Sequence, residues 1–127
     1  MKDIFDKCSF GEFTLNSRII RTGLWESQTT PNGNLTPEVY ERYEKIASSG
    51  VGLINTELVS LYPNDIFTKY SHRMNHPQFV NEAKKLAEIV HKSNVPIFAQ
   101  VGFVKYNNEN YHRLLHILNR LYVHPLL

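Results

Sequence analysis

Two histidines late in the chain have the spacing that most directly suggests chemistry. His112 and His116 are four residues apart, which would bring both imidazoles to one face of a helix and within reach of one metal ion. The segment lacks the glutamate of a zinc-protease motif, and the neighbouring Arg113 disfavours a bound cation. We therefore expect no metal site in this chain.

The other reactive side chains stand singly. Cys8 is the one cysteine, so no internal disulfide can form, and no base near it in the sequence would activate it. Glu57 is either a carboxylate that faces a ligand or one partner of a loop salt bridge. Trp25 either stacks near a ligand or fills the mouth of the fold. Residue types and spacing alone therefore assign no catalytic residue.

Composition limits the class of protein. The chain has 127 residues, 42% of them apolar and 20% charged, which is typical of one globular domain. A net charge of +2, with scattered basic residues, disfavours nucleic acid or an anionic membrane as partner. The chain starts without the apolar stretch of a secretory signal, and no apolar run approaches a membrane span. We expect a cytoplasmic protein.

The strands that would position these residues follow from short apolar or alternating runs. A hairpin is expected over residues 10–20, and its second arm continues as a first strand over residues 18–22. Apolar runs at 51–56 and 95–101 are typical of parallel strands covered on both faces.

Two amphipathic helices separate these strands. The first is predicted from Pro37, with Thr36 as its N-cap, to Gly50, and the second from near Pro77 to Asn94. The alternation of strands and helices predicts right-handed crossovers and a parallel α/β sheet. No glycine-rich phosphate loop follows the first strand, which disfavours a Rossmann or P-loop fold.

Three segments, one at each expected strand, form an ordered set. They are residues 17–26 (SRIIRTGLWE), 47–57 (ASSGVGLINTE) and 95–101 (VPIFAQV). In this order the set resembles the N-terminal part of the Old Yellow Enzyme family, the FMN-dependent NADH:flavin oxidoreductases. The resemblance implies that residues 1–105 form the N-terminal part of a TIM (β/α)8 barrel, with a hairpin, about three parallel strands and two to three helices.

The resemblance also implies where FMN would bind. Barrel sites lie at the C-terminal ends of the strands, and there the matching positions are Thr22, Gly23, Leu24, Trp25, Leu58 and Gln100. The first four would lie beside the flavin after the first strand, and Leu58, just past the second strand, stands where relatives usually have Gly or Ala. Gln100 would hydrogen-bond the flavin ring, because its amide both donates and accepts. NAD(P)H would be the reductant.

The length of the chain limits what it can do alone. A complete barrel needs ~250 residues, and the family takes its catalytic acid, its substrate-holding pair and its phosphate site from strands four to eight. We therefore expect a truncated N-terminal portion without a catalytic residue. Residues 106–127 show no family similarity and read as a divergent tail with a short helix over 111–122. That tail is either genuine or the product of a shifted reading frame.

Two functional classes follow. The first is an FMN-dependent NAD(P)H oxidoreductase that passes hydride through the flavin to an activated alkene or a similar acceptor. The alternative is a non-catalytic remnant, or a protein-association module without flavin binding. Open edges of a partial barrel would favour self-association or pairing with a complementing chain.

Overall fold

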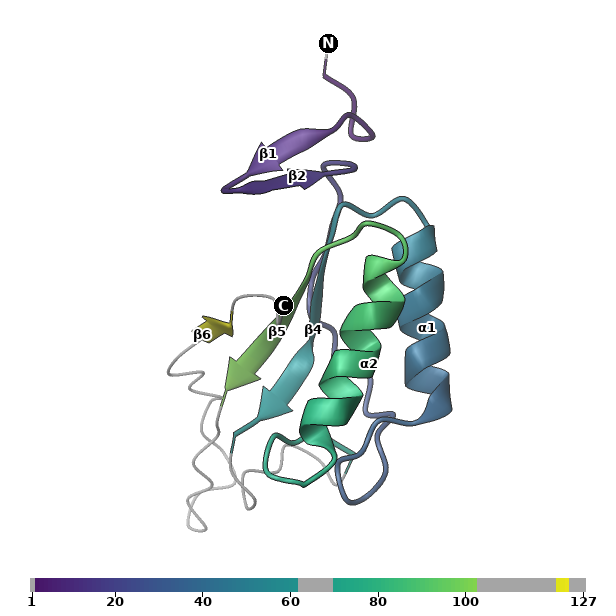
Figure 1. Cartoon of the computed structure of the whole chain (residues 1–127), viewed down its shortest axis with the longest axis vertical. Helices are drawn as coiled ribbons and strands as arrows, with labels where there is room; N and C mark the ends of the chain where they lie inside the picture. The colour runs from purple at the N-terminus through teal and green to yellow at the C-terminus, as the bar shows by residue number, and fades with distance from the viewer. Residues whose placement is uncertain (1, 62–69, 103–120, 124–127) are drawn as a thin grey trace, which may run out of the picture.

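The computed structural model describes residues 2–61, 70–102 and 121–123 (Figure 1). Its elements are β1 (Cys8–Phe10), β2 (Phe13–Leu15), β3 (Ile20–Arg21), α1 (Pro37–Ser48), β4 (Leu53–Ser60), α2 (Phe79–His91), β5 (Ile97–Gly102) and β6 (Leu121–Val123). Strands β3, β4 and β5 are parallel neighbours in one sheet, as predicted, and both predicted helices are present. Neither described helix is long and apolar enough to cross a membrane.

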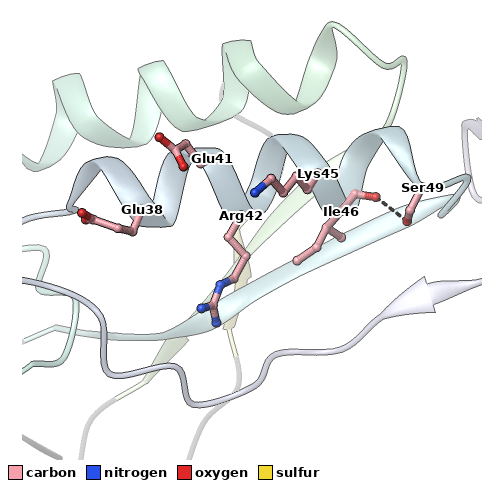
Figure 2. Close-up of a pocket in the computed structure, with 6 residues that line it drawn as sticks. All are labelled: Glu38, Glu41, Arg42, Lys45, Ile46 and Ser49. Atoms are coloured by element: carbon pink, nitrogen blue, oxygen red, sulfur yellow. Dashed lines mark hydrogen bonds between the residues drawn. The ribbon is translucent and has the colours of Figure 1, made fainter.

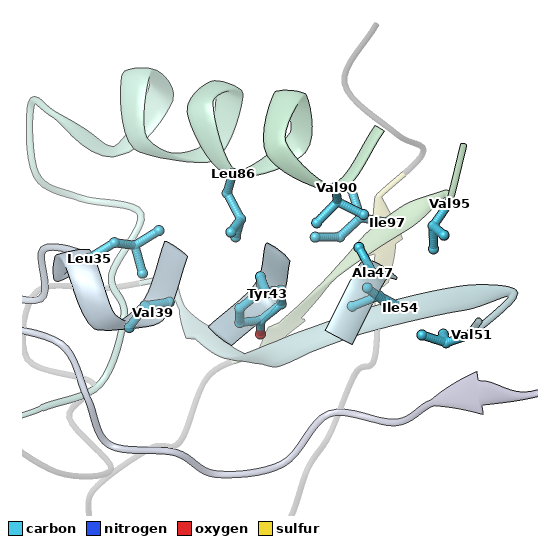
Figure 3. Close-up of a cluster of buried hydrophobic side chains, with 10 residues drawn as sticks. All are labelled: Leu35, Val39, Tyr43, Ala47, Val51, Ile54, Leu86, Val90, Val95 and Ile97. Atoms are coloured by element: carbon cyan, nitrogen blue, oxygen red, sulfur yellow. The ribbon is translucent and has the colours of Figure 1, made fainter. Parts of the chain in front are cut away.

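Both helices lie on the same face of the sheet and bury a common core against it (Figures 1 and 3). The core side chains are Leu35, Val39, Tyr43, Ala47, Val51, Ile54, Leu86, Val90, Val95 and Ile97. The core residues of α1 recur every four positions, and the two core residues of α2 are also four positions apart. This spacing keeps apolar side chains on one face of a helix. The apolar periodicity of the sequence therefore translates directly into this layer.

The ends of the helices follow most of the expected signals. Pro37 is the first residue of α1, while Gly50 and Asn94 follow the two helices with positive φ angles of 92° and 53°. Thr36 occupies the N-cap position in an extended conformation, yet its hydroxyl donates to the Gln28 carbonyl at 3.0 Å and does not cap the helix. The predicted capping hydrogen bond is wrong, because that hydroxyl instead secures the preceding loop.

The hairpin is present but nearer the N-terminus than residues 10–20. Its arms are β1 and β2, joined by a two-residue turn in which Gly11 has a φ of 59°. A positive φ at the first turn position suits a glycine and the right-handed twist of the arms. The hairpin therefore turns at residues 11–12, and the chain bends again at residues 16–18, where the Asn16 side chain donates to the Asn94 carbonyl at 3.0 Å. The hairpin thus lies across the end of the sheet where the parallel strands begin (Figure 1).

Strand β4 is longer than predicted. It runs on to Ser60 because its pairing with β5 continues past an irregularity between Asn55 and Leu58. Leu58 therefore lies inside the strand, and the prediction that it follows the strand is wrong.

The sheet ends at β3 on one side and at β6 on the other. Strand β6 pairs with β5 in antiparallel orientation, so among the described residues the expected open edge is found at β3 and not at β5. The predicted helix over 111–122 lies mostly outside the described residues, and its last two residues belong to β6.

Candidate functional site

The loop after β3 lies directly against the end of β5. Gly23 is packed so tightly that a Cβ atom there would overlap the Gln100 side-chain oxygen and would approach the Thr56 carbonyl oxygen to 2.5 Å. Glycine lets the loop backbone lie against the glutamine amide, which a larger residue would prevent without a shift. Two residues of the predicted flavin site, 77 positions apart in sequence, are thus in contact.

Leu58 lies on the neighbouring strand at the same level. It is the register partner of Gln100, and a Cβ on Gly102 would stand 3.0 Å from its side chain. The Gln100 backbone N–H donates to the Thr56 hydroxyl oxygen at 3.0 Å, which fixes the end of β5 to β4. Within the residues that the structure describes, the Gln100 amide itself makes no hydrogen bond. Gly23, Leu58 and Gln100 therefore form one patch at the ends of the strands.

The remaining predicted site residues are exposed at the same edge. Thr22 follows β3, and the next apolar side chains are Leu24, which is 62% exposed, and Trp25, which is 55% exposed. The structure places these three residues in the loop that follows β3, next to Gly23.

A buried polar cluster underlies this loop. Arg21 forms an ion pair with Glu26, and its guanidinium also donates to the Tyr43 hydroxyl at 3.0 Å and to the Asn55 carbonyl at 2.6 Å. The Tyr43 hydroxyl accepts a second bond from the Glu57 backbone N–H at 3.1 Å. We call Arg21, Glu26, Tyr43 and Glu57 the loop anchor, since they join β3, α1 and β4 beneath residues 22–27.

The Glu57 side chain binds the backbone of the loop. Its carboxylate accepts a hydrogen bond from the Glu26 N–H at 3.2 Å, and the side chain is buried, so it is neither of the two alternatives expected for it. Burial raises the pKa of the Glu57 carboxyl, with a further contribution from the Glu26 charge. Burial likewise raises the pKa of Tyr43 to about 12, so its hydroxyl is neutral.

A second cluster, which the sequence analysis missed, joins His72, His76 and Glu82. The Glu82 Oε2 atom lies 3.7 Å from His72 Nε2 and 3.4 Å from His76 Nε2. Burial, followed by the neighbouring His76, lowers the pKa of His72 to about 3. Two histidines four apart before a helix, and a glutamate in its first turn, are the signal that could have revealed it.

A hollow on the surface lies along α1 and not at the ends of the strands (Figure 2). Its lining residues are Glu38, Glu41, Arg42, Lys45, Ile46 and Ser49. Charges of both signs at helical spacing are typical of a solvated helix surface, and none of the predicted flavin-site residues lines the hollow.

Three parallel strands with helices on one face, and a hairpin at their N-terminal end, are the arrangement expected of part of an α/β barrel. Solved structures identify which barrel. The chain is similar to a variant of NCR from Zymomonas mobilis (TM-score 0.73, 25% identity, 82% of this chain and 33% of that chain). It is also similar to the old yellow enzyme from Trypanosoma cruzi (0.70, 26%, 79% and 26%) and to morphinone reductase in complex with tetrahydroNAD (0.72, 22%, 82% and 28%).

These similarities confirm the resemblance to the Old Yellow Enzyme family, and with it the prediction of the N-terminal part of a TIM barrel. The chain spans 26 to 33% of the length of those solved structures. No protein-family model and no curated protein matches it.

Proposed function

We propose that this chain forms one wall of an FMN site in an Old Yellow Enzyme type NAD(P)H oxidoreductase, which passes hydride through flavin to an activated alkene or similar acceptor. The observation that carries the proposal is the contact of Gly23 with Gln100, beside Leu58, at the C-terminal edge of the parallel strands. Sites of α/β barrels lie at this edge.

The residues of this patch suit a flavin ring. An amide that donates and accepts, as in Gln100, matches the polar pyrimidine edge of the ring. Leu58 and the exposed Leu24 and Trp25 offer apolar surface to its faces, while Thr22 and Gly23 offer backbone groups. When bound, FMN supplies the hydride relay between NAD(P)H and the acceptor. The chain's own contribution is to bind and orient the ring.

Trp25 makes this proposal easy to test. It is the one tryptophan of the chain and lies in the loop that would flank the flavin. Added FMN should therefore quench the tryptophan emission of the purified chain in a saturable way. Gln100→Leu should weaken binding about tenfold, the value of one hydrogen bond to a polar ligand group. Gln78→Leu, at an exposed glutamine before α2, is the matched control and should bind as the parent does.

The alternative function, association with another protein chain, is favoured by a different observation. Apolar side chains stand exposed at Phe10, Ile20, Leu24 and Trp25, with exposed fractions of 51%, 42%, 62% and 55%. Exposed apolar groups beside an unpaired strand edge favour self-association. A chain that self-associates in sedimentation, and whose tryptophan emission is unchanged by FMN, would support this alternative and contradict the flavin site.

A further inference from the structure

Three buried polar atoms converge in the cluster that joins the segment after residue 70 to α2. His72 Nε2, His76 Nε2 and Glu82 Oε2 are all buried, and none has a hydrogen-bond partner among the described residues. One ligand atom from each residue lies within 4.8 Å of the others. A buried polar atom without a hydrogen-bond partner destabilises the fold, so three at one point require an explanation.

Hydrogen bonds from protonated imidazole nitrogens to Glu82 explain the cluster poorly. A proton on His76 Nε2 would reach Glu82 Oε2 over a long 3.4 Å contact, and the 3.7 Å from His72 Nε2 exceeds hydrogen-bond distance. A metal ion explains it better. Ligand atoms bound at 2.0–2.2 Å in a tetrahedral site lie about 3.3–3.6 Å apart, close to both measured separations.

We propose that His72, His76 and Glu82 bind a divalent transition-metal ion of the zinc class. Two imidazoles and one carboxylate form a known zinc ligand set, which leaves a fourth position open to water or another ligand. The ion would satisfy all three buried atoms at once.

Asn34 provides the outer contact that such sites use. Its side-chain nitrogen donates to Glu82 Oε1 at 3.1 Å and lies 3.4 Å from His76 Nδ1. This hydrogen bond satisfies Glu82 Oε1 and leaves Oε2, the oxygen that faces both imidazoles, for the ion. Asn34 belongs to the loop after β3, so the ion would tie that loop to α2.

The sheet holds one side of the site in place. Ser60, the last residue of β4, donates its N–H to the His72 carbonyl at 2.9 Å and accepts the Met74 N–H at 2.9 Å. Phe79 packs on both imidazoles, with ring centroids 5.1 Å from His72 and 6.1 Å from His76. The ligands are therefore positioned before an ion arrives, at the end of a parallel strand.

Calorimetric titration of the chelator-stripped full chain with zinc tests the proposal. One ion per chain is expected, and both His76→Ala and Glu82→Gln should weaken binding at least a hundredfold. Two controls should bind as the parent does: His91→Ala, at an exposed histidine ending α2, and the double change His112→Ala with His116→Ala. Equal binding by the parent and Glu82→Gln, or loss of binding in the double control, would overturn the site.

Thermal unfolding followed by circular dichroism separates loss of the site from loss of the fold. Glu82→Gln keeps the size of the side chain, so this variant should give a parent-like spectrum without metal. Zinc should raise the Tm of the parent by several degrees and leave that of Glu82→Gln unchanged, because the ion binds only the folded ligand set. An equal zinc-induced shift in both proteins would also contradict the proposal.

Discussion

The helix-covered core and the strand-end loop anchor use opposite means to hold the same sheet. The core cluster is apolar apart from one hydroxyl, and it gains stability roughly in proportion to the area that it buries. The loop anchor instead consists of charged and polar groups, with the Arg21 and Glu26 side chains only 10% and 6% exposed. Buried charges stabilise a fold only when their partners are all in place. In the core, the loss of stability should therefore scale with the size of the side chain removed. In the loop anchor, removing one partner should destabilise the fold because it leaves another charged or polar group buried without a partner.

Tyr43 belongs to both regions. Its ring is 1% exposed within the core cluster, and its hydroxyl accepts hydrogen bonds from Arg21 and from the Glu57 backbone. The Arg21 guanidinium also lies 4.9 Å from the centre of that ring. One side chain of α1 thus couples helix packing to the position of the loop that carries Gly23 and Trp25.

The largest effect is expected in the core. Ile54→Ala removes a fully buried side chain from β4 beneath both helices and should lower the free energy of unfolding by about 4 kcal/mol. Val80→Ala, at a residue 67% exposed on α2, should change it by less than about 0.5 kcal/mol. Urea unfolding of both variants measures the contrast, and similar losses would mean that this layer is not the core.

A slightly smaller loss is expected when the loop anchor loses its cation. Arg21→Met leaves the Glu26 carboxylate buried with Arg42, at 3.8 Å, as its remaining cation, and should cost about 3 kcal/mol. Adding Glu26→Gln should recover part of that loss, because it removes the uncompensated charge. Urea unfolding of the single and double variants is the measurement. Additive losses in the double variant would show that the two side chains are not coupled.

Sequence periodicity predicted the core well, for a physical reason. Helix faces and buried strands repeat with fixed periods, so residues such as Val39, Tyr43, Leu86 and Val90 could be assigned to the interior without a structure. Features that depend on contacts distant in sequence were missed. The extension of β4 depends on its pairing with β5, and the bond from Thr36 to Gln28 depends on the path of a loop.

The candidate site also has a part that could be predicted from local sequence and a part that depends on contacts between distant segments. Gln100 was placed at a strand end from the sequence, but its contact with Gly23 follows from two strands lying side by side. The loop anchor was not predicted, because Arg21, Tyr43 and Glu57 lie on three different elements. A local pattern carries no information about such a group until the strands are paired.

Removing the Tyr43 hydroxyl should have an intermediate effect that separates the two regions. Tyr43→Phe keeps the ring in the core and leaves Arg21 and the Glu57 N–H without that acceptor, so a loss of about 1–2 kcal/mol is expected. Tyr40→Phe, on the same helix, is the matched control and should cost less. Comparing the two variants by urea unfolding tests whether the hydroxyl or the ring couples core and anchor.

The smallest effect should appear as a difference in pH dependence. Burial raises the pKa of Glu57 in the folded state above the ordinary 4.5, so the folded protein binds more protons than the unfolded chain between the two pKa values. For this group, stability is then highest below about pH 4.5, and it falls as pH rises through the folded pKa.

The variant Glu57→Gln lacks this titration but keeps an oxygen that can accept the Glu26 N–H. The unfolding free energy of Glu57→Gln minus that of the parent should therefore increase from pH 4 to pH 8, whereas Glu44→Gln, at an exposed position of α1, should show no such trend. A constant difference for Glu57→Gln across this range would mean that the carboxylate is not held in a desolvated site, and the contrast between core and anchor would then rest on the Arg21 and Glu26 pair.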